Sequence, residues 1–217
     1  MMPLQNRVTP RGDLIATAER GTMFGNRGVL HDAERRIVRY SQGRRWIVCR
    51  LAFRGRHRPI MHPGFYTELF FLDEATALAA GHRPCAECRR QEYQDFRRYW
   101  ASVHGDRSGT LPSADEMDAR LHGDRLVAPG KRKTYRDDIA ALADGVFILH
   151  EDEAWLLWQS ALLHWTPGGY DRRLARPTEG EVTVLTPRAT ARTIAAGYAP
   201  TVHPSVQVGE QAGGTME

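Results

Sequence analysis

The segment HRPCAEC, residues 82–88, limits the possible folds of this 217-residue chain more than any other feature. It places Cys85 and Cys88 three positions apart, and the sequence has only one further cysteine, Cys49. A small, odd number of cysteines in a chain of this length does not suggest a disulfide framework. In a reducing compartment, such a pair favours a metal site or a thiol–disulfide centre.

The composition is that of a globular protein away from membranes. Hydrophobic residues make up 41% of the chain and charged residues 26%, both ordinary values for globular domains. No apolar run approaches the roughly 20 residues that a membrane helix requires. The N-terminal residues contain no apolar stretch suited to secretion. We therefore expect a cytoplasmic protein without a membrane partner.

The surroundings of the cysteine pair favour zinc over redox chemistry. A redox pair of this kind stands between a strand and the first helix of a βαβ unit, whereas this pair follows an expected helix, EATALAA, that Gly81 ends. A zinc deaminase combines P-C-x-x-C with an upstream H-x-E, whose glutamate transfers protons. Residues 84–88 match the first of these patterns, but no H-x-E precedes them. We therefore predict a zinc site.

Zinc sites of this type need four ligands, so two more must come from elsewhere in the sequence. In RRWIVCRLAFRGR, apolar and charged residues alternate as in a strand, and Cys49 falls on the apolar side. A buried thiol explains this position as well as a zinc ligand does, and we take Cys49 as the third ligand. We favour His31, in a polar loop, as the fourth. The candidates for that place are His31, His57, His62 and His82.

Residues 70–90, FFLDEATALAAGHRPCAECRR, resemble the second half of the zinc-binding module of Ada-type DNA methylation-repair proteins. The resemblance covers under a tenth of the chain, and it implies that Cys85 and Cys88 bind zinc. It also implies that Arg89 and Arg90 lie near DNA phosphates. The first half of that module has two further cysteines, where this chain has Cys49 alone. A wider pattern, from GNRGVLH to HRPCAEC, resembles a group of bacterial proteins of this length, which implies no activity.

Arginine is concentrated in one part of the sequence. Nine arginines and no acidic residue lie between Arg35 and Arg58. Such a local excess is the electrostatic footprint of a phosphate-bearing partner, although a well-solvated surface would give the same pattern. We predict that nucleic acid, DNA in particular, is the partner. The predicted phosphate contacts are Arg50, Arg54, Arg89 and Arg90.

The element pattern predicts an α+β fold. We expect a small mixed sheet with short helices around the zinc site in residues 1–124, a β-rich region in residues 125–205 and a disordered tail in residues 206–217. Ser113 and Glu116 form a capping box for a helix that Gly123 ends. Residues 145–158 read as a hairpin, followed by a strand, EVTVLTP, and a helix, RATARTIAA.

Three functions are compatible with these features. We predict a zinc-containing nucleic-acid-binding protein linked to DNA repair or modification. A hydrolase or deaminase-like enzyme, whose zinc keeps an open position to activate water, is the first alternative. A structural zinc domain for protein–protein contacts is the second. The sequence assigns no catalytic residue.

Overall fold

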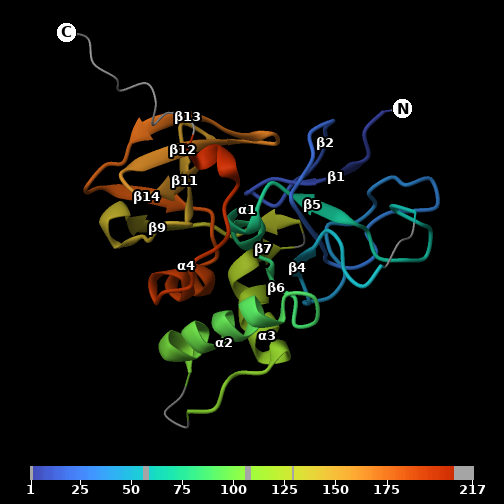
Figure 1. Cartoon of the computed structure of the whole chain (residues 1–217), viewed down its shortest axis with the longest axis horizontal. Coiled ribbons are helices and arrows are strands. Elements are labelled where there is room, and N and C mark those ends of the chain that lie inside the picture. The colour runs from blue at the N-terminus through green and yellow to red at the C-terminus, as the bar shows by residue number, and fades with distance from the viewer. Residues whose placement is uncertain (1, 56–58, 106–108, 129, 208–217) are drawn as a thin grey trace.

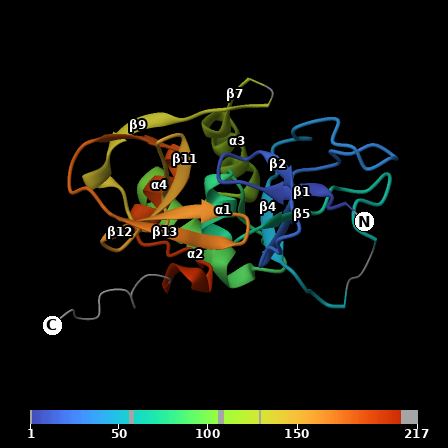
Figure 2. The ribbon, with the colours of Figure 1, turned by 90° about the horizontal axis from the view of Figure 1, so that it is seen from above.

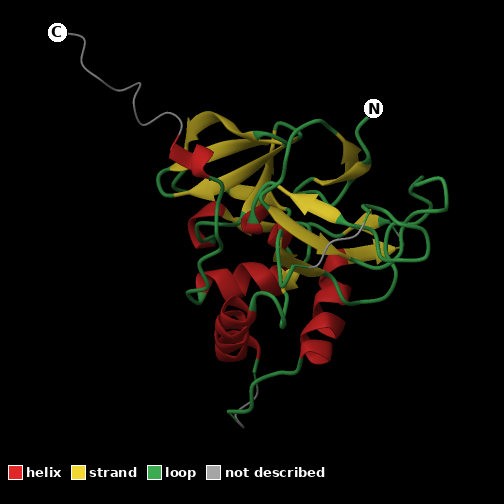
Figure 3. Ribbon diagram, turned by 45° about the vertical axis from the view of Figure 1, so that its right-hand side comes forward, coloured by secondary structure: helices red, strands yellow, loops and turns green. Residues whose placement is uncertain are grey.

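The structure is a computed structural model that describes residues 2–55, 59–105, 109–128 and 130–207. Two six-stranded sheets stand on either side of a short central helix, α1, and the longer helices gather at one end of the molecule (Figures 1 and 2). Figure 3 shows the longer helices below the strands. The predicted α+β class is confirmed.

The N-terminal sheet carries the cysteines. Its order is β2-β1-β5-β3-β4-β6, with parallel pairing between β1 and β5 and between β4 and β6, and antiparallel pairing elsewhere. The strands are β1 Gln5–Val8, β2 Leu14–Ala16, β3 Met23–Asn26, β4 Ile47–Arg50, β5 Leu69–Phe71 and β6 Arg83–Pro84.

The C-terminal sheet is antiparallel, in the order β13-β12-β11-β10-β14-β9. The predicted hairpin is confirmed as β10 and β11, and the turn residues Glu151 and Asp152 have the positive φ that such a tight turn requires. The strands are β9 Tyr135–Asp138, β10 Phe147–His150, β11 Glu153–Trp158, β12 Ala161–Thr166, β13 Gly169–Ala175 and β14 Glu181–Val184. A separate pair consists of β7 Leu126–Ala128 and β8 Lys131–Arg132.

Within the described ranges four helices accompany the sheets, and α4 packs against both α2 and α3. They are α1 Glu74–Ala79, α2 Arg90–His104, α3 Ala114–Arg125 and α4 Arg188–Ala195, with 3-10 turns at Ile139–Ala141 and Pro204–Gln207. Asp73 caps α1, and the predicted capping box opens α3. The predicted end of α3 at Gly123 is wrong by two residues. Gly123 does not adopt the positive φ of a helix-ending glycine, and α3 continues to Arg125, whose buried guanidinium donates to the carbonyls of Gly81 and Arg44, each at 2.6 Å.

The short helix α1 joins the two sheets because all six of its residues are buried. Ala77 packs in the cluster of the N-terminal sheet, Ala75 and Ala79 pack in a cluster of the C-terminal sheet, and Leu78 packs among the longer helices. A helix buried on every side needs small apolar residues, which explains its alanine-rich sequence. The expected boundary near residue 124 therefore does not separate two cores.

The structure describes only the first two residues of the expected C-terminal tail. Most of the expected tail, residues 208–217, lies outside the described residues, but Val206 is buried in the last 3-10 turn. Among the residues that the structure describes, we find no helix with the length and apolar character needed to span a membrane.

Candidate metal centre

The three cysteines converge because β4 pairs with β6. Cys49 lies in β4, and the next strand, β6, ends at Pro84, opposite Val48. The N–H of Cys85 donates to the carbonyl of Val48 at 2.9 Å, which continues this pairing by one residue. The N–H of Arg89 then donates to the carbonyl of Cys85 at 3.1 Å, and this turn brings Cys88 back toward Cys85.

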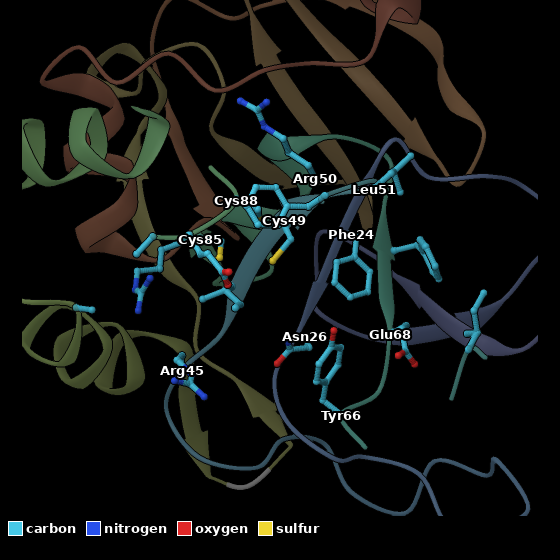
Figure 4. Close-up of a pocket in the computed structure, with 18 of the residues that line it drawn as sticks. Phe24, Asn26, Arg45, Cys49, Arg50, Leu51, Tyr66, Glu68, Cys85 and Cys88 are labelled. Carbon is cyan, nitrogen blue, oxygen red and sulfur yellow. The ribbon is translucent and has the colours of Figure 1, made fainter. Parts of the chain in front are cut away.

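The sulfur atoms are close enough to share one ion. Each pair of Sγ atoms from Cys49, Cys85 and Cys88 lies within 4.8 Å, and all three residues are buried (Figure 4). Thiolates that bind one zinc ion at about 2.3 Å in a tetrahedral arrangement lie about 3.8 Å apart. The separations are compatible with this arrangement, so the cluster could hold a metal ion, and its soft sulfur donors suit zinc, copper(I) or iron–sulfur chemistry.

Hydrogen bonds already favour negative charge on one of these sulfurs. The thiols of Cys49 and Cys88 donate to Cys85, and the N–H groups of Cys88 and Glu87 do the same, which lowers the pKa of Cys85 to about 2. The hydrogen bond to Cys85 raises the pKa of Cys49 far above its usual value. Metal binding would release the protons that the remaining thiols carry.

The structure does not bring His31 to the cysteines. Nδ1 of its ring lies 2.6 Å from the hydroxyl of Thr67, and Nε2 lies 3.3 Å from the carbonyl of His62, so both ring nitrogens face the loop around residue 67. Within the described part of the chain, no other histidine, cysteine or carboxylate joins the three sulfurs.

The other candidate histidines differ in position. His62 is exposed, with Nδ1 at 3.1 Å from the carbonyl of Pro63. His82 is fully buried between the rings of Trp46 and Phe71. His57 lies outside the described residues.

Of the four predicted phosphate contacts, Arg50, Arg54 and Arg90 are exposed. The expectation for Arg89 is corrected, because its side chain is only 2% exposed and its guanidinium pairs with Glu74 in the core. The sequence contains a signal for this difference. Arg89, the N-cap residue of α2, lies four residues before Tyr93 and seven before Phe96, in line with the buried stripe of the helix, whereas Arg90 lies beside that stripe.

The cysteine cluster forms part of the wall of a cavity of about 850 Å³. Phe24, Asn26 and Tyr66 line the same cavity next to Cys49 (Figure 4). Arg45 and Arg50 also line this cavity. Sequence reasoning missed Phe24 and Asn26. Their signal is the spacing of two in MFGN, which places both side chains on one face of β3.

Comparison with known proteins adds no relative. No protein-family model, no curated protein and no solved structure matches the chain. What the centre does must therefore follow from its own donors, charges and surroundings. Those features establish three buried thiols that could bind one metal ion.

Proposed function

We propose that this chain is a zinc protein that binds nucleic acid, with Cys49, Cys85 and Cys88 as zinc ligands. The observation that carries the proposal is the place of the cysteine cluster in the wall of an open cavity whose lining includes Arg45 and Arg50. A thiolate centre beside exposed guanidinium groups suits an anionic partner, since arginine binds phosphate through a rigid fork of donors.

The arginines that remain exposed support the same partner. Arg50 follows Cys49 directly, and its only ion pair among the described residues is a 3.4 Å contact with Glu92, which a phosphate can displace at little cost. Arg54, five residues after Cys49, and Arg90, two residues after Cys88, are also exposed. The resemblance of residues 70–90 to the Ada-type module makes DNA the preferred nucleic acid and repair or modification the expected setting.

An enzymatic role is the second candidate, and a specific observation favours it. The described residues supply three sulfur ligands and no fourth side chain, while the same sulfurs line the cavity. A zinc ion with three protein ligands and one open position is the arrangement that activates water. A bound zinc ion would then supply a hydroxide at neutral pH, and the cavity would receive the substrate.

Metal analysis followed by a salt series tests the proposed function. The purified protein should contain about one zinc per chain, and the logarithm of its affinity for single-stranded DNA should fall linearly with the logarithm of salt concentration. Arg45→Ala and Arg50→Ala should each lower that slope by about 0.7. Arg192→Ala, an exposed site on α4, is the matched control and should leave the slope unchanged. Binding that does not depend on salt, or a salt slope that neither Arg45→Ala nor Arg50→Ala changes, would overturn the proposal.

A further inference from the structure

The cavity beside the cysteines has an aromatic wall. The ring of Phe24 lies 6.1 Å from that of Tyr66 and 6.0 Å from that of Phe70, in tilted and edge-to-face arrangements. These are cavity residues rather than core residues, because Phe24 and Phe70 are only partly buried and Tyr66 is 37% exposed. Two further apolar side chains of the lining, Leu51 and Ile60, are 56% and 42% exposed. Apolar surface gathered around one hollow marks a site for a ligand with a flat, apolar face.

One polar side chain in this wall, that of Asn26, is available to hydrogen-bond with a ligand. Asn26 lies two residues after Phe24 on the same face of β3, and its carboxamide makes no side-chain hydrogen bond within the described part of the chain. A carboxamide offers one acceptor and two donors, which is the set that reads the edge of a nucleobase.

A second hollow of about 560 Å³ adjoins the first. The two share Asn26, Arg45 and Asp115 in their linings, and the second adds Arg44. Neither Arg44 nor Arg45 makes a side-chain hydrogen bond or ion pair among the described residues, and both are exposed. An aromatic compartment is therefore joined to a compartment with two available guanidinium groups.

We propose that these two compartments bind one nucleotide unit, with its base against Phe24, Tyr66 and Phe70 and its phosphate at Arg44 and Arg45. The inference rests on the proposed function and specifies the substrate class: a strand whose base is unstacked and turned outward, or a free nucleotide of the same chemistry. A base in a duplex would first have to leave the stack, so single-stranded or extrahelical bases are preferred. Asn26, which lines both compartments, meets the polar edge of the base.

The test compares strands that differ only in their bases. Fluorescence anisotropy of the full-length, zinc-loaded protein is measured with a labelled single strand of 12 nucleotides, about the length that such sites cover. The second strand has the same length and charge, but every base is replaced by the tetrahydrofuran abasic analogue. The strand with bases should bind about tenfold more tightly, because stacking on an aromatic side chain contributes most of the difference.

Two matched variants locate the effect. Phe24→Leu keeps an apolar side chain and removes the aromatic face, so it should bring the two affinities close together while binding of the abasic strand stays the same. Phe65→Leu, at an exposed phenylalanine outside both linings, should preserve the tenfold preference. Equal binding of the two strands by the unaltered protein, or a preference that survives Phe24→Leu, overturns the base pocket and leaves nucleic-acid binding intact.

A third arm separates the two sources of the base. The fluorescent monophosphate of 2-aminopurine riboside is titrated alone, and stacking against the aromatic wall should quench its emission. Quenching that Phe24→Leu abolishes, together with no binding of either strand, supports the pocket for a free nucleotide and overturns the nucleic-acid function. If neither strand nor nucleotide binds, both proposals fail.

Discussion

Arg89 and Glu74 form a buried ion pair, in which Nη1 of Arg89 lies 2.7 Å from Oε1 of Glu74 and Nη2 donates to Oε2 at 2.8 Å. Arg89 follows Cys88 directly, so the pair ties the cysteine segment to the central helix α1. The hydroxyl of Tyr198 and the N–H of Thr201 also donate to Glu74. One carboxylate therefore connects the cysteine segment with residues 198–201, which follow α4.

Removal of Arg89 should destabilise the protein strongly. Arg89→Ala leaves the carboxylate of Glu74 buried without its cation, which costs about 3–5 kcal/mol in the free energy of unfolding. Arg90→Ala, at the exposed neighbour, should change that free energy by no more than about 0.5 kcal/mol. Urea denaturation measures both. Similar stabilities of the two variants would contradict a structural role for the pair.

Replacement of one cysteine of the cluster should cause the protein to lose both its bound metal and part of its stability. Cys85→Ser should lower bound zinc well below one per chain and lower the melting temperature, because the ion would hold β4, β6 and the start of α2 together. Ala86→Ser, at the exposed position between the two cysteines of the motif, is the control and should retain the metal. Zinc content by atomic absorption and melting by circular dichroism are the measurements.

A chelator shows whether the loss of stability in Cys85→Ser comes from loss of the metal ion or from the serine side chain itself. It should lower the melting temperature of the unaltered protein and leave that of Cys85→Ser unchanged. Zinc retention should also fall as pH falls, since protons compete with the metal for the three sulfurs. Full zinc content in Cys85→Ser would refute the assigned ligand set.

Local signals in the sequence predict much of the secondary structure and the three cysteines. Asp73 accepts from the N–H of Thr76, and Ser113 and Glu116 cap each other, because such hydrogen bonds need only residues three positions apart. The alternation of apolar and charged residues predicts Cys49 on the apolar side, and the other two cysteines meet it there, although Val48 on the opposite face of β4 is fully buried as well. The exposed Leu51 departs from that alternation because β4 ends at Arg50, opposite Met23, where its partner β3 begins.

The relations that the sequence could not predict are long-range. The burial of Arg83 depends on Asp118, 35 residues away, and that of Arg89 depends on Glu74, on a different helix. No periodicity in either segment encodes these partners. The order β2-β1-β5-β3-β4-β6 likewise brings the cavity-lining residues of β5, β3 and β4 side by side through pairings between segments far apart in the sequence.

Removal of the negative charge of Asp115 should raise the affinity of the protein for nucleic acid. It is exposed and lines both hollows beside Arg45, so it repels a phosphate there. Asp115→Asn should raise the affinity for single-stranded DNA severalfold at low salt, and the gain should shrink as salt screens the charge. Asp152→Asn, in the exposed turn of the β10–β11 hairpin, removes the same charge far from the hollows along the chain and should have little effect. Equal gains in both variants would indicate a general charge effect and count against a phosphate at Arg45.

The buried side chain of His82 should make the free energy of unfolding depend on pH. Burial, together with the nearby charges of Arg27, Arg125 and Arg132, holds the pKa of His82 well below 6.5. Both of its ring nitrogens lack a hydrogen-bond partner among the described residues, so the ring is neutral in the folded protein. Below pH 6.5 the unfolded chain binds a proton at this histidine while the folded chain does not. The free energy of unfolding therefore falls as pH falls through that value.

His82→Phe should remove this dependence. Phenylalanine keeps a planar ring between Trp46 and Phe71, so stability at pH 7.5 should stay similar or rise. Between pH 7.5 and pH 5.5 the unaltered protein should lose about 1.4 kcal/mol more than the variant. Urea denaturation at both pH values, with zinc content monitored, measures the difference. Because both proteins contain the same three cysteines, loss of metal at low pH affects them equally, and parallel pH profiles would show that His82 accepts a proton in the folded state.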